Sequence, residues 1–331
     1  MMEPEEDFPD YSKEDDAADL LELSVPLADG GLRLDQALVK LLPQYSRSRL
    51  QDWIGQGLVT VNGQPATVKQ KVWGGEQIAV SPQAHPSEMV AEPEDIPLDI
   101  VYEDEAILVI DKPVGLVVHP GSGNWQGTLL NALLFHAPEL KEVPRAGIVH
   151  RLDKDTSGLM VVAKTLVAQT ALVRQMQARS VKREYIALVW GELDRDYTIN
   201  VPIGRHPTQR TKMATTESGK EAITHVSILE RFPSCTLVRC KLETGRTHQI
   251  RVHLSWLGHP LVGDATYLKG VQKCVPALRD MLNGFPRQAL HATRLALDHP
   301  ITGKRMEFDA PLPDDFDELL AQIEEVSDVV E

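Results

Sequence analysis

The chain has 331 residues, of which 42% are hydrophobic and 25% are charged. This composition is ordinary for a globular protein, and no apolar run approaches the roughly 20 residues that span a bilayer, so we do not expect a membrane protein. The first residues include Glu3, Glu5 and Glu6 in place of a basic and then apolar segment, which argues against a secretory signal and predicts a cytoplasmic location. A chain of this length usually forms more than one core, so we expect two domains.

The formal net charge of −14 argues against nucleic-acid binding at first sight, but the acid is concentrated at the two ends. Residues 1–20 hold nine acids and one lysine, and residues 314–331 hold eight acids and no base, so each segment has a net charge of −8. Subtracting both from −14 leaves +2 for residues 21–313. The N-terminal segment has too few apolar residues to form a core, and we predict that it is disordered.

The first compact pattern combines two helices and a hairpin. Apolar residues recur at helical spacing over residues 34–41, and a second helix is predicted over residues 45–54 with Ser46 as its N-cap. Alternating apolar residues over 59–61, followed by Asn62-Gly63, predict a β-hairpin, because this dipeptide tolerates the positive φ angles of tight turns.

The order of these elements, with the segments 33–35, 46–48 and 59–63, resembles the S4 RNA-binding module. Six bases outnumber three acids over residues 31–80. Charge alone does not separate an RNA-binding face from an ordinary solvated surface, but the ordered motif favours RNA. The residues predicted to bind RNA here are Arg33, Arg47, Arg49, Lys69 and Lys71.

Residues 84–97 contain three prolines without hydrophobic periodicity, which predicts an exposed linker. Beyond it, strands are predicted at Ile107–Ile110, Val117–Val118, Leu159–Ala163, Tyr185–Trp190, Thr236–Leu242 and Ala292–Leu297, and helices at Leu129–Phe135, Leu166–Arg179 and Thr247–Leu257. The helices are too few and too unevenly placed for a repeating βαβ design, so we predict an α+β fold with a mixed sheet.

The segment Gly121–Gly127 follows a predicted strand and precedes a predicted helix, as a dinucleotide-binding loop would. Its third glycine is one position late, and no βαβ unit with a ribose-binding acid follows, so a plain loop fits better. The chain also lacks the phosphate-binding pattern G-x-x-x-x-G-K-[ST]. We therefore expect no nucleotide cofactor.

A tight polar turn, His150–Gly158, joins two apolar runs, and catalytic groups are often placed on loops held by such rigid flanks. In one interpretation the turn presents a catalytic carboxylate. In the other it is a surface turn whose polar side chains cap backbone amides. Capping accounts better for Asp155, Thr156 and Ser157, whereas spacing alone leaves Asp153 open.

A second dense polar segment covers residues 242–254. Gly245 interrupts a predicted strand, Thr247 can cap the following helix, and His248 and Arg251 then lie three residues apart on one helical face. An arginine there could hold a buried carboxylate in its ionised form. The alternative is a helix with a solvated basic face, which this segment by itself slightly favours.

A metal site is the remaining possibility that residue types suggest. The candidate ligands are His119, His150, His248, His253 and Asp153. Their local spacing includes no H-x-x-x-H step, and basic residues crowd each of them, so we expect no metal. The three cysteines, Cys235, Cys240 and Cys274, form no C-x-x-C pair, so neither a disulfide framework nor a thiolate zinc site is expected.

Taken together, these segments resemble the pseudouridine synthases that join an S4 module to the catalytic domain of the ribosomal large-subunit enzymes. The resemblance extends from about Leu32 to Pro313 and is most specific at His150–Gly158. The matching segments of the catalytic part are Asp111–Pro120, His150–Gly158, Lys182–Tyr185, Arg205–Pro207 and Gly245–His253.

The resemblance implies a mixed, mainly antiparallel sheet flanked by helices, in addition to a small S4 α/β domain. It divides the chain into a disordered acidic tail over residues 1–20, an S4 RNA-binding domain over 21–83, a linker over 84–97 and a catalytic domain over 98–331.

The implied reaction needs no cofactor: the N-glycosidic bond of a uridine is broken, the uracil turns, and its C5 is joined to the sugar C1′. Asp153 matches the essential aspartate, which acts either as a nucleophile or as a base. Tyr185 matches the tyrosine that packs on the uracil and helps to remove the C5 proton, and Arg251 matches the arginine paired with the aspartate. Arg151 matches the residue that fills the space left by the flipped uridine.

The basic run over residues 205–212 then resembles an RNA-contacting loop, with an ordinary exposed hairpin tip as the alternative. The residues predicted to bind RNA there are Arg205, Arg210 and Lys212. The expected partner is a stem-loop of large-subunit ribosomal RNA or its assembly intermediate, and we expect a monomer.

Two rival functions remain. A non-catalytic RNA-binding or ribosome-assembly factor on the same fold would have lost Asp153, Tyr185 or Arg251, but all three are present. A hydrolase or nuclease that uses Asp153 with Asp155 would release free base or cut the strand, whereas isomerisation leaves the RNA intact.

Overall fold

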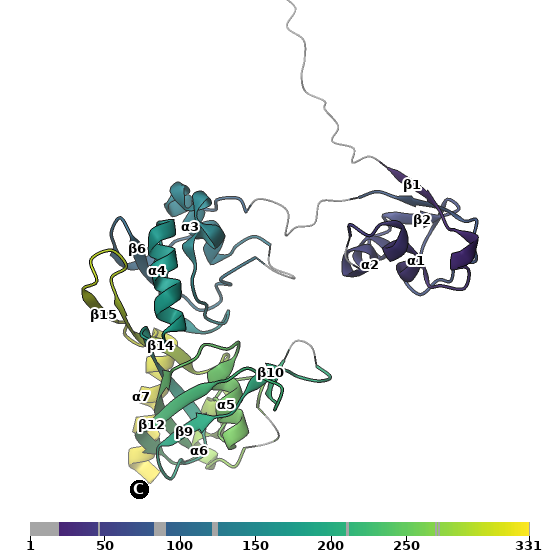
Figure 1. Cartoon of the computed structure of the whole chain (residues 1–331). Coiled ribbons are helices and arrows are strands. Elements are labelled where there is room, and N and C mark those ends of the chain that lie inside the picture. The colour runs from purple at the N-terminus through teal and green to yellow at the C-terminus, as the bar shows by residue number, and fades with distance from the viewer. Residues whose placement is uncertain are drawn as a thin grey trace, which may run out of the picture. The chain divides into compact units, whose positions relative to one another are not determined.

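A computed structural model of the chain describes residues 20–45, 47–82, 91–120, 125–209, 212–268, 270 and 272–330. It divides into two compact units, one that ends at Val90 and one that begins at Ala91 (Figure 1). The predicted disordered tail, apart from Leu20, and the predicted cap Ser46 lie outside the described residues. No helix in the described part of the chain is long and apolar enough to cross a membrane.

The first unit packs two helices on a four-stranded sheet. Its elements are β1 (Leu21–Ser24), α1 (Leu34–Leu41), α2 (Arg47–Gly55), β2 (Val59–Val61), β3 (Gln64–Pro65) and β4 (Gln77–Val80), with a short 3-10 turn at Leu27–Asp29. The strand order is β1-β4-β2-β3. Asn62 and Gly63 have φ angles of 50° and 76°, so the predicted tight turn joins β2 to β3. Leu34, Leu38 and Leu50 are fully buried in its core.

The second unit is built on one large sheet in the order β5-β6-β7-β14-β8-β13-β12-β9, with β15 paired to β14. The strands are β5 (Asp99–Glu103), β6 (Ile107–Lys112), β7 (Ser157–Ala163), β8 (Lys182–Trp190), β9 (Tyr197–Asn200), β12 (Ile223–Phe232), β13 (Cys235–Leu242), β14 (Leu290–Asp298) and β15 (Arg305–Asp309). A separate hairpin pairs β10 (Ile203–Arg205) with β11 (Met213–Thr215). Within the described sheet, β7 and β14 pair in parallel and the other neighbours are antiparallel.

Helices cover both faces of this sheet. They are α3 (Leu129–His136), α4 (Leu166–Gln177), α5 (Gln249–Leu257), α6 (Pro276–Gly284) and α7 (Asp314–Val330), with 3-10 turns at Pro138–Glu142 and Pro144–Gly147. Figure 1 shows α4 beside the sheet near β6 and α7 beside β12. Thr128 and Thr165 cap α3 and α4, each accepting a hydrogen bond from a backbone N–H of the first turn.

Alternation along β8 divides its residues between the two faces, as the two-residue period of a strand requires. Tyr185, Ala187 and Val189 belong to the core that includes α3 and α5, whereas Leu188 and Trp190 pack with α6 and α7. The face that contains Tyr185 is the one on which the candidate site is formed.

The predicted α+β class with a mainly antiparallel sheet is confirmed. Val117–Val118 is not a strand: Val117 forms a single bridge to Thr128. Of the predicted linker 84–97, residues 84–90 lie outside the described residues, while residues 91–97 belong to the second unit. There the Asn131 side chain donates to the Glu92 carbonyl, and the Glu94 carboxylate accepts from Gly127 N.

The acidic C-terminal segment is a helix, because its apolar residues recur at helical spacing. Phe316, Leu319 and Ile323 of α7 are buried against the sheet core.

Candidate active site

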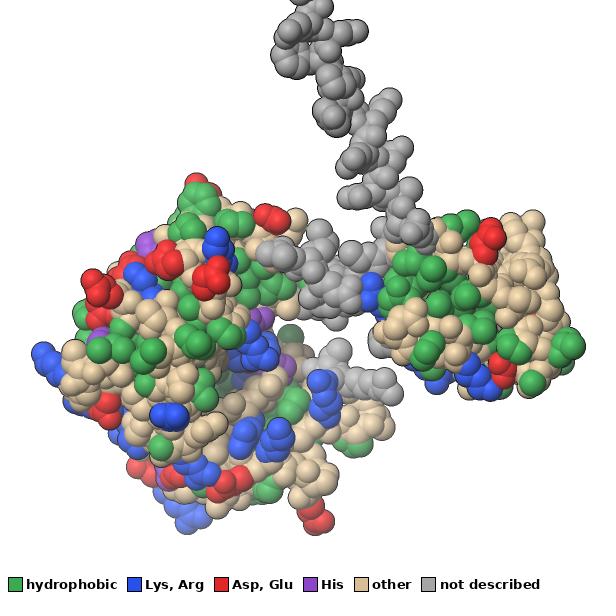
Figure 2. Space-filling view, turned by 45° about the horizontal axis from the view of Figure 1, so that its top comes forward, with side chains coloured by type: hydrophobic (Ala, Val, Ile, Leu, Met, Phe, Trp, Pro, Cys, Tyr) green, Lys and Arg blue, Asp and Glu red, His purple; other side chains and the backbone are tan. Residues whose placement is uncertain are grey.

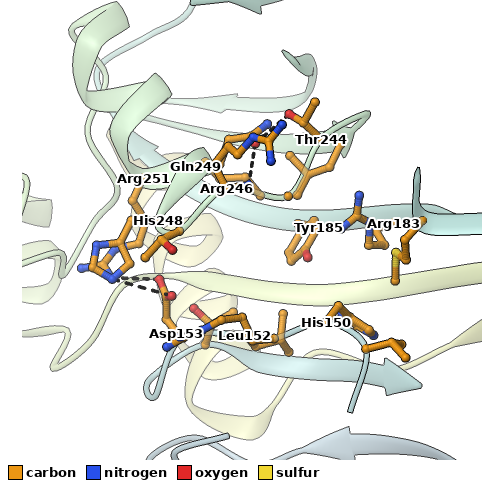
Figure 3. Close-up of a pocket in the computed structure, with 18 of the residues that line it drawn as sticks. His150, Leu152, Asp153, Arg183, Tyr185, Thr244, Arg246, His248, Gln249 and Arg251 are labelled. Carbon is orange, nitrogen blue, oxygen red and sulfur yellow. Dashed lines mark hydrogen bonds and ion pairs between the residues drawn. The ribbon is translucent and has the colours of Figure 1, made fainter. Parts of the chain in front are cut away.

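A cavity of about 600 Å³ opens on the α5 face of the second unit, a size usual for a small-ligand site. It is lined by the turn before β7, the end of α4, the start of β8 and the loop that leads into α5. Figure 3 shows Asp153, His248 and Arg251 at one end, Tyr185 in the middle, and His150 with Arg183 at the other end. On the surface, Figure 2 shows Lys and Arg side chains gathered beside a hollow in this unit.

A buried lysine at the end of β6, Lys112, holds the turn that contains Asp153 through hydrogen bonds to backbone carbonyls. The Nζ of Lys112 donates to the carbonyls of Lys154 and Leu116, both at 3.1 Å, and to that of Pro113 at 2.7 Å. Burial lowers the pKa of Lys112 to about 8, so it is still protonated at neutral pH and can donate all three bonds. Gly115 N adds a 2.9 Å bond to the Lys154 carbonyl. The backbone next to Asp153 is therefore held rigidly.

The prediction that Thr156 and Ser157 cap backbone amides is wrong. Both side chains are buried and bond to side chains instead: Thr156 Oγ1 accepts from Gln288 at 3.1 Å, and Ser157 Oγ lies 2.9 Å from His291 Nδ1. These bonds tie the turn to β14, which pairs in parallel with β7, and to Gln288 just before β14.

Asp153 and Arg251 form an ion pair at one end of the cavity. Asp153 Oδ2 accepts a 2.9 Å hydrogen bond from Arg251 Nη1. The other edge of the Arg251 guanidinium donates two bonds, 2.7 and 2.8 Å, to the fully buried carboxylate of Asp264. Burial alone would lower the pKa of Arg251, but the hydrogen bonds and charges of Asp264 and Asp153 raise it above its usual value. Arg251 is thus a fixed cation, not part of a solvated face.

His248 completes this end of the cavity. Its Nδ1 lies 2.7 Å from the Tyr267 hydroxyl, and its Nε2 lies 3.7 Å from Asp153 Oδ1. Burial is the main reason that the pKa of His248 is lowered, so at neutral pH the ring is uncharged. The predicted cap Thr247 is wrong by one residue: α5 begins after His248, whose backbone adopts a left-handed conformation with φ of 55°.

Tyr185 lies on β8 with 6% exposure and lines the cavity. Burial raises the pKa of its phenol, and the charge of Asp153 acts in the same direction. Tyr185 is therefore a neutral, largely apolar platform at physiological pH. Arg151, in contrast, is exposed at the cavity wall. Burial is the main cause of the lowered pKa of His119 and of His248, and the charge of Arg151 is a smaller cause in the same direction.

In the first unit, two of the predicted RNA-binding residues share a buried carboxylate. Asp35 has no exposed side-chain surface, and it accepts hydrogen bonds from Arg33 at 3.0 Å, Arg47 at 2.7 Å and Gln51 at 2.6 Å. Burial would raise the pKa of Asp35, but these bonds, led by Arg47, lower it. Arg33 and Arg47 therefore have a structural role, although 37% and 50% of their side chains remain exposed.

The other three residues predicted to bind RNA in this unit differ in their surroundings. The Arg49 guanidinium packs over the rings of Tyr45 and Trp53, 4.8 and 4.9 Å from their centroids. Lys69 and Lys71 are exposed, and Lys71 lies 6.0 Å from the ring of the exposed Trp73. An exposed aromatic ring beside positive charges suits a single-stranded nucleic acid, because nucleobases stack on such rings and the charges follow the phosphate backbone.

The basic run over 205–212 forms part of the β10–β11 hairpin. Arg205 is exposed at its base, and Arg210 lies outside the described residues. Lys212 is directed inward instead, since its Nζ donates a 2.8 Å bond to the Thr266 carbonyl two residues after Asp264. Lys212 thus fastens the hairpin to the segment that orients Arg251.

Sequence reasoning missed Lys112, Arg183, Asp264 and Tyr267 as parts of the site. The sequence contains only a weak indication that Asp264 is functional: it is an acid directly after the apolar residues 261–263. Its role became visible only when the fold brought it to Arg251.

An RNA pseudouridylate synthase family model matches residues 106–256, and an S4 domain model matches residues 32–78. The chain is 55% identical to ribosomal large subunit pseudouridine synthase D of Nitrosomonas europaea, over 96% of this chain and 94% of that one. It is 56% identical to the protein of the same name from Pseudomonas aeruginosa, over 88% and 92%. A solved structure of human RNA pseudouridylate synthase domain containing 1 matches 70% of this chain and 90% of its own, with a TM-score of 0.54 and 29% identity.

Proposed function

Because the chain belongs to the RNA pseudouridylate synthase family and is of its ribosomal large-subunit type, we propose that it isomerises specific uridines in a stem-loop of large-subunit (23S) ribosomal RNA. Asp153 is the essential carboxylate of this proposal. The observation that carries it is the convergence of Asp153, Arg251 and Tyr185 on one cavity.

The chemistry requires a carboxylate within reach of the ribose of a uridine that has left its stack. Asp153 meets this need in either of its two possible roles, as nucleophile at the nucleotide or as base at the ribose. Arg251 holds one oxygen, Oδ2, at 2.9 Å, while the nearest partner of Oδ1 is His248 Nε2 at 3.7 Å, too far for a hydrogen bond. Oδ1 is thus the oxygen we assign to the reaction.

Tyr185 supports the uracil ring during its turn. Its raised pKa keeps the phenol protonated at neutral pH, which favours the packing role over direct removal of the C5 proton. A neutral ring also offers a flat surface on which the uracil can rotate without breaking strong hydrogen bonds.

Arg151 and the first unit supply the contacts to RNA outside the cavity. Arg151 is exposed at the wall, where it can enter the space left by the extruded uridine. We assign RNA binding in the first unit chiefly to Lys69, Lys71 and Arg49 with the rings of Tyr45 and Trp53. Arg33 and Arg47 contribute less, because their guanidinium groups also donate hydrogen bonds to Asp35. Phosphate contacts of this kind position an RNA without reading its sequence.

The test incubates the protein with unmodified large-subunit rRNA in the presence of a chelator and maps pseudouridine by carbodiimide-dependent reverse-transcription stops. We expect discrete stops with the wild-type protein and none with Asp153→Asn. Stops of equal strength in Asp153→Asn would refute the catalytic role of Asp153. An absence of stops in the wild type would refute the substrate, and strand cleavage would favour a nuclease.

A further inference from the structure

Three arginines in the described part of the second unit are almost fully buried: Arg183, Arg251 and Arg287, with 9%, 6% and 5% exposure. Arg251 binds Asp264 and Asp153, and Arg287 binds Asp315 through two 2.7 Å bonds. Arg183 differs from both. Among the described residues, no carboxylate lies within 4.0 Å of its guanidinium, and its buried Nε–H has no hydrogen-bond partner.

Arg183 is a wall of the same cavity. It precedes Tyr185 by two residues on β8, so both side chains project from one face of the strand. In Figure 3 Tyr185 lies between Arg183 and the cluster formed by Asp153, His248 and Arg251. A nucleotide whose base packs on Tyr185 therefore has Arg183 on the side away from Asp153.

A second donor without a partner lies near Arg183. The ring of His150 accepts a 3.0 Å hydrogen bond at Nε2 from Val161 N, so the proton of the neutral ring is on Nδ1. This buried Nδ1 has no partner among the described residues, and His150 lines the cavity. In Figure 3 His150 and Arg183 lie at the same end of the cavity, and the charge of Arg183 adds to burial in lowering the pKa of His150.

The loop before α5 leaves room for the Arg183 guanidinium. A Cβ on Gly245 would lie 2.6 Å from Arg183 Nη1 and would meet no backbone atom at such range. A side chain at 245 would thus displace the end of Arg183 without disturbing the backbone. Glycine at this position lets the loop backbone close over the guanidinium.

A largely buried guanidinium without an anion is costly, because burial removes much of its hydration and no opposite charge compensates for it. Two other arginines at the cavity have partners of their own: Arg179 binds Glu221 and Glu243, and Arg246 donates to the Glu221 carbonyl. An anion delivered by the ligand would compensate Arg183. The planar fork of an arginine suits the oxygens of a phosphate.

We propose that Arg183, assisted by the Nδ1–H of His150, binds a backbone phosphate that flanks the uridine in the cavity. The proposal rests on the proposed function only in that an RNA nucleotide enters this cavity. In this arrangement the sugar lies at the end of the cavity near Asp153, the base packs on Tyr185, and the phosphate binds Arg183.

The test measures binding of uridine 3′,5′-bisphosphate and of uridine to the full-length protein by calorimetry. The wild type is expected to bind the bisphosphate more tightly than uridine. Arg183→Gln is expected to weaken binding of the bisphosphate by about 10- to 100-fold, because a charged hydrogen-bonded contact is lost. The affinity for uridine should stay within about 2-fold of the wild-type value. Gly245→Ala should weaken the bisphosphate in the same sense, because it displaces Arg183 without removing it.

The matched control is Gly284→Ala at the end of α6, where a Cβ meets nothing within 4 Å. It should bind both probes as the wild type does. Equal bisphosphate affinity in the wild type and Arg183→Gln would overturn the proposal, as would equal losses for uridine and the bisphosphate. A wild type that does not prefer the bisphosphate would overturn it too.

The binding experiment needs no ribosomal RNA, so it separates this proposal from the proposed function. Failure of the rRNA assay with normal bisphosphate binding would refute the substrate alone. Stops in the rRNA with unchanged bisphosphate binding in Arg183→Gln would refute the phosphate site alone. In the rRNA assay Arg183→Gln should raise KM more than it lowers kcat.

Discussion

The carboxylate of Asp264 accepts two hydrogen bonds, of 2.7 and 2.8 Å, from the guanidinium of Arg251. Asp264 is itself held by the backbone N–H groups of Thr266 and Tyr267. The direction in which Arg251 points at Asp153 is therefore decided by a residue that does not reach the cavity.

Asp264→Asn should slow catalysis more than it weakens RNA binding. The amide can accept only on one oxygen, so Arg251 loses its fixed orientation and Asp153 loses its alignment with the ribose. We expect a fall in the single-turnover rate of roughly 100-fold, the usual effect of an error of about 1 Å in placement. Release of tritium from RNA labelled at uridine C5 measures the rate, and Asp280→Asn, at an exposed site on α6, is the control. A rate within 2-fold of the wild type would contradict the assignment.

Lys112→Met should both destabilise the second unit and reduce activity. It leaves the carbonyls of Pro113, Leu116 and Lys154 without the Nζ donor. We expect a loss on the order of 3 kcal/mol in the free energy of unfolding, because buried acceptors lose their partner. Urea unfolding measures this, with the exposed Lys141→Met as control. Activity is measured at a low temperature at which Lys112→Met remains folded. Normal activity there would mean that Lys112 is not needed to position the turn that contains Asp153.

The stability of the second unit should fall as the pH decreases below about 6.5. Burial lowers the pKa of His150 to about 3, whereas the unfolded chain titrates at the ordinary 6.5. The unfolded state therefore binds more protons between these values, so the contribution is complete above pH 6.5 and is lost as the pH falls toward 3. His291, whose pKa burial lowers to about 4, acts in the same direction.

His150→Gln keeps an acceptor for Val161 N but removes the titrating ring. Between pH 4 and 6 the slope of unfolding free energy against pH should become shallower by up to about 1.4 kcal/mol per pH unit. Urea unfolding at several pH values measures the slope. An unaltered slope would mean that His150 does not titrate as its burial requires.

Arg47→Ala and Lys69→Ala should separate two kinds of basic residue in the first unit. Arg47 binds the buried Asp35, so its loss should destabilise this unit by about 1–3 kcal/mol and also weaken RNA binding. Lys69 is exposed, so its loss should leave stability unchanged while it weakens RNA binding and reduces the slope of log affinity against log salt by about 1. Thermal unfolding and filter binding at several salt concentrations provide the measurements. Equal effects of the two variants on stability would contradict the role of Arg47 at Asp35.

Local patterns in the sequence predicted the elements on which the site is built. The helices at α1, α3 and α4, the turn at Asn62-Gly63 and the polar turn before β7 all follow from hydrophobic period or turn chemistry, which act within a few residues. The same patterns mispredicted Val117–Val118 and the cap of α5, because the backbone there is shaped by bridges and bonds to distant segments.

The sequence by itself determined that a carboxylate, a tyrosine and an arginine occur in the order of a known family. Only the tertiary structure decided which charges neutralise one another. Asp153 and Arg251 are 98 residues apart in the chain, Lys112 and Lys154 are 42 apart, and Arg183 meets no carboxylate in the described structure. The physical reason is that the cost of a buried charge depends on what the fold brings within a few ångströms of it, and residue spacing does not encode that distance.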